Sequence, residues 1–173
     1  RLHLRGFQRR DTVDVFGYAS DPAVLLHTTG LTPRSVEDSQ VFVDSMLRKA
    51  ANSYAWAICV KGKSRVIGAV EFGLQDETEG GIHYALGLEF WNRGLMTEAC
   101  RAVLAWAFSV HSNLACVTTE AVVENRGSTR VMEKCGMRYQ RTVEHTWEKF
   151  DNPVQLAVYS IDREQWDRFR DRC

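Results

Sequence analysis

The chain has 173 residues, 45% of them hydrophobic, so it is long enough to bury a core and too apolar to be disordered. Lys plus Arg and Asp plus Glu each number 22, and this zero net charge argues against nucleic acid as a main partner. No apolar run reaches the length of a membrane span and no signal peptide is visible, so we expect a cytoplasmic protein with no membrane partner. The sequence starts at Arg1 rather than at Met, which suggests a trimmed N-terminus.

The first part of the sequence alternates short strands with helices. Asp11 and Ser35 precede apolar stretches of helical period, and side-chain oxygens of this kind cap helix N-termini. Gly68 lies inside a strand pattern, where a glycine marks a bulge or a close backbone contact. In chain order we expect a strand at 2–7, helices at 12–19 and from 35 to about Ala51, and a strand pair at 54–60 and 65–74.

The centre of the sequence combines a strand, a glycine turn and a long helix. Strict alternation over 82–89 predicts a strand half buried on one face, and a turn follows at 90–94. Thr97 and Glu98 then fall in the first turn of a helix, where acceptors and negative charge suit the free amides. The apolar stripe of this helix is expected to contain Ala99, Ala102, Val103, Trp106, Ala107 and Val110.

The last part of the sequence predicts a strand, a helix and two further strands. A Val- and Thr-rich strand at 114–123 precedes a helix at 127–135, which Gly136 ends. Strands at 138–150 and 154–161 follow, and Asp162 caps a last helical turn. No repeat or linker interrupts the sequence, so we expect a single domain over 1–173, built on a mixed α/β sheet.

The turn at 90–94 has the features of an anion-binding site. Free N–H groups at a helix N-terminus and the helix dipole both favour negative charge. Gly94 lets the backbone approach a phosphate closely, and Arg93 adds a full charge. A plain surface turn is the alternative. The sequence contains neither a Walker A loop nor a Gly-x-Gly-x-x-Gly dinucleotide fingerprint.

The run at 91–96, WNRGLM, resembles the pyrophosphate loop of the GNAT acyltransferase superfamily. That loop reads Gln/Arg-x-x-Gly-x-Gly/Ala between the fourth strand and the third helix, so Trp91 and Met96 depart from it. Tyr84, the run at 89–91, Gly94 and the run at 97–99 together resemble the ribosomal-protein N-terminal acetyltransferase (RimJ/RimL-like) branch.

A second run, at 120–137, resembles the family segment Asn-x-x-Ser/Ala-x-x-Val-x-Glu-Lys-x-Gly-Phe, with Met137 in place of Phe. Two motifs at the right separation are more specific than either alone, and the order of elements fits the family over essentially the whole chain. The resemblance implies a GNAT-like mixed, mostly antiparallel twisted sheet of about seven strands. It also implies about four flanking helices and a splay between the fourth and fifth strands.

The resemblance implies an N-acetyltransferase that uses acetyl-CoA as co-substrate, needs no metal, and acts on a protein N-terminal α-amine or a small-molecule amine. Asn125 matches the family's pantetheine-binding Asn, and its position also suits a helix cap. Arg126, Arg130 and Lys134 share one helix face, which either is solvated or attracts the coenzyme's 3′-phosphate. The expected coenzyme-binding residues are Leu86, Gly87, Leu88, Arg93, Gly94, Leu95, Met96, Thr97, Asn125, Ser128 and Arg130.

Acyl transfer to an amine needs a base for the ammonium proton and an acid for the leaving thiolate. Glu120 is the first candidate base, because some related acetyltransferases carry a catalytic Glu five residues before the Asn. It lies in an apolar strand, where burial would raise its pKa, although a solvent-facing position is the alternative. Glu71 and His83 are further candidates, and His83 also fits a purely structural role. By resemblance, a backbone amide near Leu88 would stabilise the oxyanion.

The acid is harder to assign, because Met132 occupies the position where the family often has a Tyr. Ser128 is the substitute candidate, with water as the alternative donor and pantetheine binding or helix capping as its alternative roles. A non-catalytic module that binds acyl-CoA is therefore the alternative to an enzyme. We expect a monomer or a homodimer. Acidic residues that could guide a basic acceptor are Glu37, Asp38, Glu144 and Glu148.

The cysteines form no Cys-x-x-Cys pair and have no His at zinc spacing. Four of the five lie in apolar patterns, so we expect free, buried thiols rather than disulfides or metal ligands. The five are Cys59, Cys100, Cys116, Cys135 and Cys173.

Overall fold

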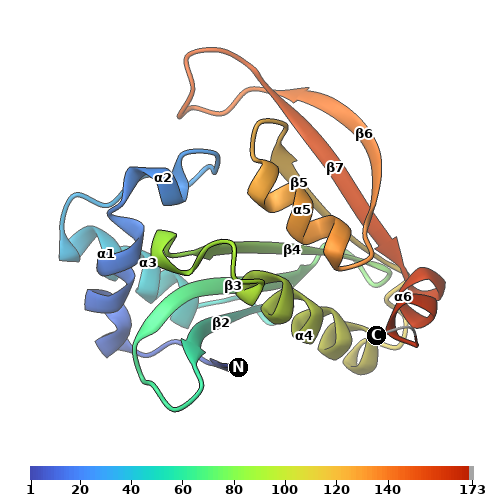
Figure 1. Ribbon diagram of the computed structural model, residues 1–173, viewed down its shortest axis with the longest axis horizontal. Coiled ribbons are helices and arrows are strands. Elements are labelled where there is room, and N and C mark those ends of the chain that lie inside the picture. Colours follow the sequence, from blue (N-terminus) through green and yellow to red (C-terminus); the bar gives the residue numbers. More distant parts are fainter. Residues whose placement is uncertain (172–173) are drawn as a thin grey trace.

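The computed structural model describes residues 1–171, which contain a seven-stranded sheet with helices on both faces (Figure 1). The strand order is β1-β2-β3-β4-β5-β7-β6, and every neighbouring pair is antiparallel except β4 and β5. The expected mixed, mostly antiparallel sheet is confirmed. The strands are β1 (Leu2–Arg5), β2 (Ser53–Val60), β3 (Val66–Leu74), β4 (Glu79–Leu86), β5 (Cys116–Val122), β6 (Arg138–His145) and β7 (Val154–Asp162).

Six α-helices lie in the described part of the chain, rather than about four, and none is long and apolar enough to cross a membrane. The number is higher because Asp21 caps a short extra helix, accepting a hydrogen bond from the Ala23 amide at 2.9 Å, and because the last turn extends into a helix. The helices are α1 (Thr12–Ala19), α2 (Pro22–Leu25), α3 (Val36–Leu47), α4 (Leu95–Val110), α5 (Arg126–Lys134) and α6 (Arg163–Arg170), with 3-10 turns at Arg9–Asp11 and Leu88–Phe90.

Two details of the N-terminal helices differ from the prediction. Ser35 caps α3 as expected, but α3 ends at Leu47 instead of continuing to about Ala51. Asp11 occupies the N-cap position of α1, yet its side chain makes no cap bond there. Its buried carboxylate instead accepts two hydrogen bonds from the Arg5 guanidinium, at 2.7 and 2.8 Å, so Asp11 fastens α1 to β1.

Two glycines in the central strands allow close packing. A Cβ at Gly68 would lie 2.5 Å from the carbonyl oxygen of Ala85, which confirms the predicted close backbone contact. A Cβ at Gly80 would lie 2.6 Å from the ring of Phe72. Gly80 lies in β4, where only a glycine leaves room for that ring over the strand.

The two central strands, β4 and β5, diverge after a short contact. They pair in parallel only through Glu79–Gly81 and Cys116–Thr118. The Thr119 hydroxyl then donates a hydrogen bond to the carbonyl of Ile82 at 2.7 Å, and beyond this point β5 pairs only with β7. The expected splay between the fourth and fifth strands is therefore confirmed, and the sheet is open in its middle (Figure 1).

Apolar clusters cover both faces of the sheet. One contains the inner sides of α4, α5 and α6, and the other contains those of α1 and α3. The buried stripe of α4 is rotated from the predicted one, because Ala102 and Val110 are exposed whereas Leu104 and Phe108 are buried. Phe108 packs on Trp166 of α6, with ring centroids 5.9 Å apart, and this tertiary contact sets the rotation.

Candidate active site

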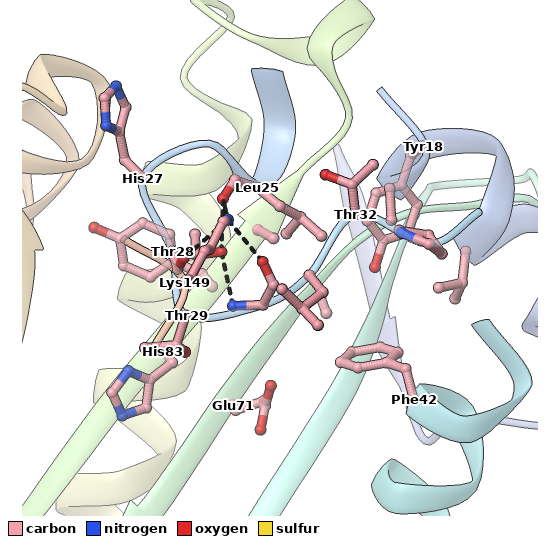
Figure 2. Close-up of a pocket in the computed structure, with 18 of the residues that line it drawn as sticks. Tyr18, Leu25, His27, Thr28, Thr29, Thr32, Phe42, Glu71, His83 and Lys149 are labelled. Atoms are coloured by element: carbon pink, nitrogen blue, oxygen red, sulfur yellow. Dashed lines mark hydrogen bonds between the residues drawn. The ribbon is translucent and has the colours of Figure 1, made fainter. Parts of the chain in front are cut away.

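A cavity of about 1270 Å³ lies beside the splay of the sheet. Strands β3, β4 and β5 form one wall, α1, α3 and the loop at 27–34 form the opposite wall, and α5 closes one end. Figure 2 shows Tyr18 and Phe42 across from Glu71 and His83 in this space. The cavity thus joins the sheet face that carries carboxylates to the helix that carries the second sequence motif.

The three candidate bases border this single cavity. Glu71 of β3 and His83 of β4 are cross-strand partners, and Glu120 of β5 lines the same space. The expectation that Glu120 is buried is wrong: its side chain is exposed to the cavity. The alternation of β5 buries Thr119 and Ala121 and turns Glu120 to the open side.

The carboxylates of Glu71 and Glu120 differ in their partners. Glu71 is half-buried and forms an ion pair with Lys49, which follows α3. Its charge is therefore already compensated. Within residues 1–171 no cation forms an ion pair with Glu120, so no such partner competes for its carboxylate.

Helix α5 presents the second motif to the cavity. The Asn125 side chain caps the helix by accepting a hydrogen bond from the Ser128 amide at 3.1 Å, as predicted. Asn125, Ser128 and Met132 all line the cavity. The Tyr84 hydroxyl reaches across the splay and donates to the carbonyl of Ser128 at 3.1 Å. The sequence analysis used Tyr84 only as part of the family resemblance and missed this role.

The turn before α4 has the backbone geometry of an anion site. Asn92 and Gly94 both adopt positive φ, 58° and 71°, and such left-handed positions direct neighbouring amides into a concave nest. The first intrahelical bond runs from the Glu98 amide to the carbonyl of Gly94, which leaves the preceding three amides without helical partners. The side chains of Leu95, Met96 and Thr97 are buried, so these residues offer their amides only.

The first motif lies apart from the main cavity. Arg93 is exposed, and its guanidinium sits over the ring of Phe90 at 5.8 Å. None of the residues from Leu86 to Thr97 lines the cavity described above. The structure therefore brings together the predicted catalytic residues and the α5 residues, and it places the predicted diphosphate turn outside this group.

The end of β4 restricts which amide could stabilise an oxyanion. The carbonyl of Leu86 accepts a hydrogen bond from the Trp91 indole at 2.6 Å. The Gly87 amide donates to the carbonyl of Ile67 at 2.8 Å, so it is already used. Leu88, half exposed in the 3-10 turn, is the neighbour that remains for this role.

Of the predicted acceptor-guiding acids, only Asp38 lines the cavity, where its carboxylate also accepts a hydrogen bond from the Arg34 amide at 2.8 Å. Glu37 at the start of α3, Glu144 of β6 and Glu148 in the loop after β6 are exposed and do not line the cavity. Arg126, Arg130 and Lys134 form an exposed face of α5. Three of the thiols, Cys59, Cys100 and Cys135, are free and buried, Cys116 is free and half-buried, and Cys173 lies outside the described residues.

Lys149, from the loop between β6 and β7, closes the roof of the cavity. Its ammonium donates hydrogen bonds to the carbonyls of Leu25, Thr28 and Gly30, at 2.5, 3.1 and 2.8 Å. Figure 1 shows this hairpin arching from the far edge of the sheet towards the loop after α2. Lys149 and Trp147 both line the cavity, a contribution that no local sequence pattern indicated.

A mixed sheet opened at one parallel pair, with a nest at the following helix and a cavity beside the opening, defines an acyltransferase-type α/β fold. The family model for the acetyltransferase (GNAT) domain matches residues 1–138, so the chain belongs to the GNAT superfamily and is an N-acetyltransferase. This membership favours an enzyme over a module that only binds acyl-CoA.

Individual relatives agree with this family. An uncharacterised N-acetyltransferase of Bacillus subtilis, YnaD, is 28% identical over 171 residues, which cover 96% of each chain. The structure of a GNAT-family acetyltransferase from Bacillus anthracis matches with a TM-score of 0.83 at 26% identity, covering 95% of this chain and 96% of that one. A Vibrio cholerae spermidine N-acetyltransferase, solved with CoA and spermine, shares the fold, with a TM-score of 0.79, 14% identity, and 95% and 97% coverage.

Proposed function

We propose that the protein transfers the acetyl group of acetyl-CoA to a primary amine by direct attack in a ternary complex, with Glu120 as general base. The observation that carries this proposal is the position of Glu120. It is unpaired within the described residues and borders the cavity whose other end is formed by Asn125 and Ser128. Glu71 is the weaker candidate, because its charge is engaged by Lys49.

The chemistry follows from the ionisation of the reactants. An aliphatic amine has a pKa of about 10.4 and an α-amine one of about 7.7–8.0, so the acceptor arrives largely protonated. Glu120 takes that proton, the amine nitrogen then bonds to the thioester carbon, and the C–S bond breaks. The adduct nitrogen must lose a second proton to become an amide, and Ser128 or water relays that proton to the leaving thiolate, while the Leu88 amide is the candidate donor to the oxyanion.

The coenzyme is held by the two motifs in this proposal. The nest at 92–97 and the positive end of α4 bind the diphosphate, with Arg93 beside them. Asn125 and Ser128 contact the pantetheine arm, and Arg130 attracts the 3′-phosphate from the exposed face of α5. The V. cholerae neighbour, which was solved with CoA, supports coenzyme use by this fold.

We also place the chain in the ribosomal-protein N-terminal acetyltransferase (RimJ/RimL-like) branch, on the strength of the residues at 84–99. The acceptor is then a protein N-terminal α-amine or a small amine of similar reactivity. The polyamine in the V. cholerae structure is a ligand of that protein. At 14% identity it does not identify the acceptor of this chain.

The coenzyme site is tested by the thermal melt with and without acetyl-CoA. At 100 times its Kd the ligand adds about 2.7 kcal/mol, or roughly 5–10 °C for a chain of this size. Gly94→Glu should abolish this shift by placing a charge and a side chain in the nest. Gly62→Glu is the matched control, because Gly62 has φ +80° in an open hairpin turn, so it carries the same backbone strain away from the site.

The base is tested by thiol release with an amine panel. Glu120→Gln should lower kcat by about 10²–10⁴-fold while the acetyl-CoA melting shift stays unchanged. Glu124→Gln is the control, since Glu124 is exposed just beyond β5 and does not line the cavity. Full activity of Glu120→Gln would contradict the assignment.

A further inference from the structure

A tyrosine on the wall opposite Glu71 has no part in the transfer chemistry. Tyr18 of α1 is only 6% exposed and lines the cavity (Figure 2). A Cβ at Gly87 would lie 3.0 Å from the Cβ of Tyr18, so this glycine makes room for the side chain. Tyr18 also packs in the cluster that contains Ala69 and Ala85, two small residues on the sheet face that leave the cavity open.

The Tyr18 hydroxyl has no hydrogen-bond partner within residues 1–171, whereas the Tyr84 hydroxyl is bonded to Ser128. Buried phenols normally find a partner, because an unsatisfied polar group is costly. The Tyr18 hydroxyl is instead open to the cavity that its residue lines, so a ligand in the cavity can supply the partner that the protein does not.

The charges around the cavity indicate what that ligand offers. Burial, and then the negative charge of Glu71, raise the pKa of Tyr18, so its phenol stays protonated and can donate. Asp38, Glu71 and Glu120 all border the cavity. Glu71 is compensated by Lys49, and the ammonium of Lys149 is engaged by three carbonyls, but Asp38 and Glu120 have no ion-pair partner within residues 1–171. A carboxylate on the ligand would be repelled by these two charges, whereas an uncharged oxygen would not.

We propose that Tyr18 is a specificity-determining residue that donates a hydrogen bond to an uncharged oxygen close to the amino group of the acceptor. The acceptor is then an amino alcohol or an α-amino amide, and not a plain alkyl amine. This inference rests on the proposed function, in which the amine lies beside Glu120. A small molecule and the first residue of a peptide both offer such an oxygen, so the test separates these sources.

The test compares the wild type with Tyr18→Phe, using 2-aminoethanol against propylamine and glycinamide against isobutylamine. Amine-dependent thiol release gives kcat/KM for each, and the ratio of wild type to variant cancels differences in amine basicity. We expect a fall of about tenfold for the oxygen-bearing amine of a pair and little change for its alkyl partner. A fall with 2-aminoethanol alone favours a small amino alcohol, and a fall with glycinamide alone favours a peptide terminus.

The control is Tyr139→Phe, because Tyr139 is 54% exposed on β6 and its hydroxyl contacts Thr142, away from the cavity. The second readout is the melting temperature of the CoA-bound protein with each amine. In the wild type the oxygen-bearing amine should raise this temperature more than its alkyl partner does, and this difference should disappear only in Tyr18→Phe. Equal effects on both amines of a pair, or no effect on either, overturn the inference. A normal coenzyme shift in that case leaves the proposed function standing, whereas no coenzyme shift in the wild type removes both.

Discussion

Tyr18 is buried and Tyr84 is half-buried at opposite walls of one cavity, and desolvation of each phenol raises its pKa above the ordinary 10.0. In the unfolded chain each titrates near its ordinary pKa. An acid whose pKa is raised by folding stabilises the folded state fully below its unfolded pKa, and this contribution is lost as the pH rises. Stability should therefore fall from about pH 10 upwards, by at most about 1.4 kcal/mol per pH unit for each phenol.

Tyr84→Phe should make this alkaline decline shallower. The substitution also removes the hydrogen bond to Ser128, which lowers the whole curve, so the slope and not the level is the measured quantity. Urea denaturation at a series of pH values gives the slope. Exposed Tyr139→Phe should keep the wild-type slope, and an unchanged slope in Tyr84→Phe would contradict the argument.

At the scale of elements, the Lys149 ammonium connects the β6–β7 hairpin to the loop after α2. Lys149→Met keeps the length of the side chain and removes its three bonds to carbonyls at 25–30. We expect a loss of about 1–3 kcal/mol, because bonds to charged groups are stronger than neutral ones. Hydrogen exchange should accelerate in both loops, while acetyl-CoA affinity stays the same.

Lys63→Met is the control for the loss of the Lys149 hydrogen bonds, because Lys63 is exposed in the β2–β3 turn. If Lys149→Met leaves exchange at 25–30 unchanged, the hairpin is held by other contacts. Trp147 and Phe150, whose rings lie 5.7 Å apart, would then be the first alternative.

The elements themselves could be predicted from sequence because their signals are local. The Asn125 cap, the Gly136 stop at φ 82° and the Gly94 turn each depend on neighbours within a few residues. Contacts between distant segments carry no such signal. The engagement of Glu71 by Lys49 and the use of Asp11 by Arg5 both overrode simpler local interpretations.

The candidate site divides in the same way. Glu120 and the α5 residues were found from a motif, which reports on the chain near it. Tyr18 and Lys149 were missed, since each reaches the cavity only through the packing of α1 and of the last hairpin. The wall of the cavity that α1 and the last hairpin form could therefore be identified only from the structure.

For the whole molecule, the two apolar clusters share one sheet and should unfold together. Leu104 and Val43 are fully buried in the clusters on opposite faces. Leu104→Ala should cost about 2–5 kcal/mol, and Val43→Ala should cost less because it removes fewer atoms. Each variant should lower the urea midpoint with an unchanged m-value and a single transition. Two separate transitions would show that the splay divides the sheet into independent units.

The hydrogen bonds from Lys149 to the loop after α2 also have a consequence for the order of folding. One of them joins positions 119 residues apart, and contacts of such high sequence separation are closed late, after local structure has formed. The elements of the proposed coenzyme site, β4, α4 and α5, are all synthesised before the hairpin emerges. We expect a nascent or refolding chain to recognise coenzyme before it can enclose an acceptor, so that selectivity for the amine is the last property the molecule acquires.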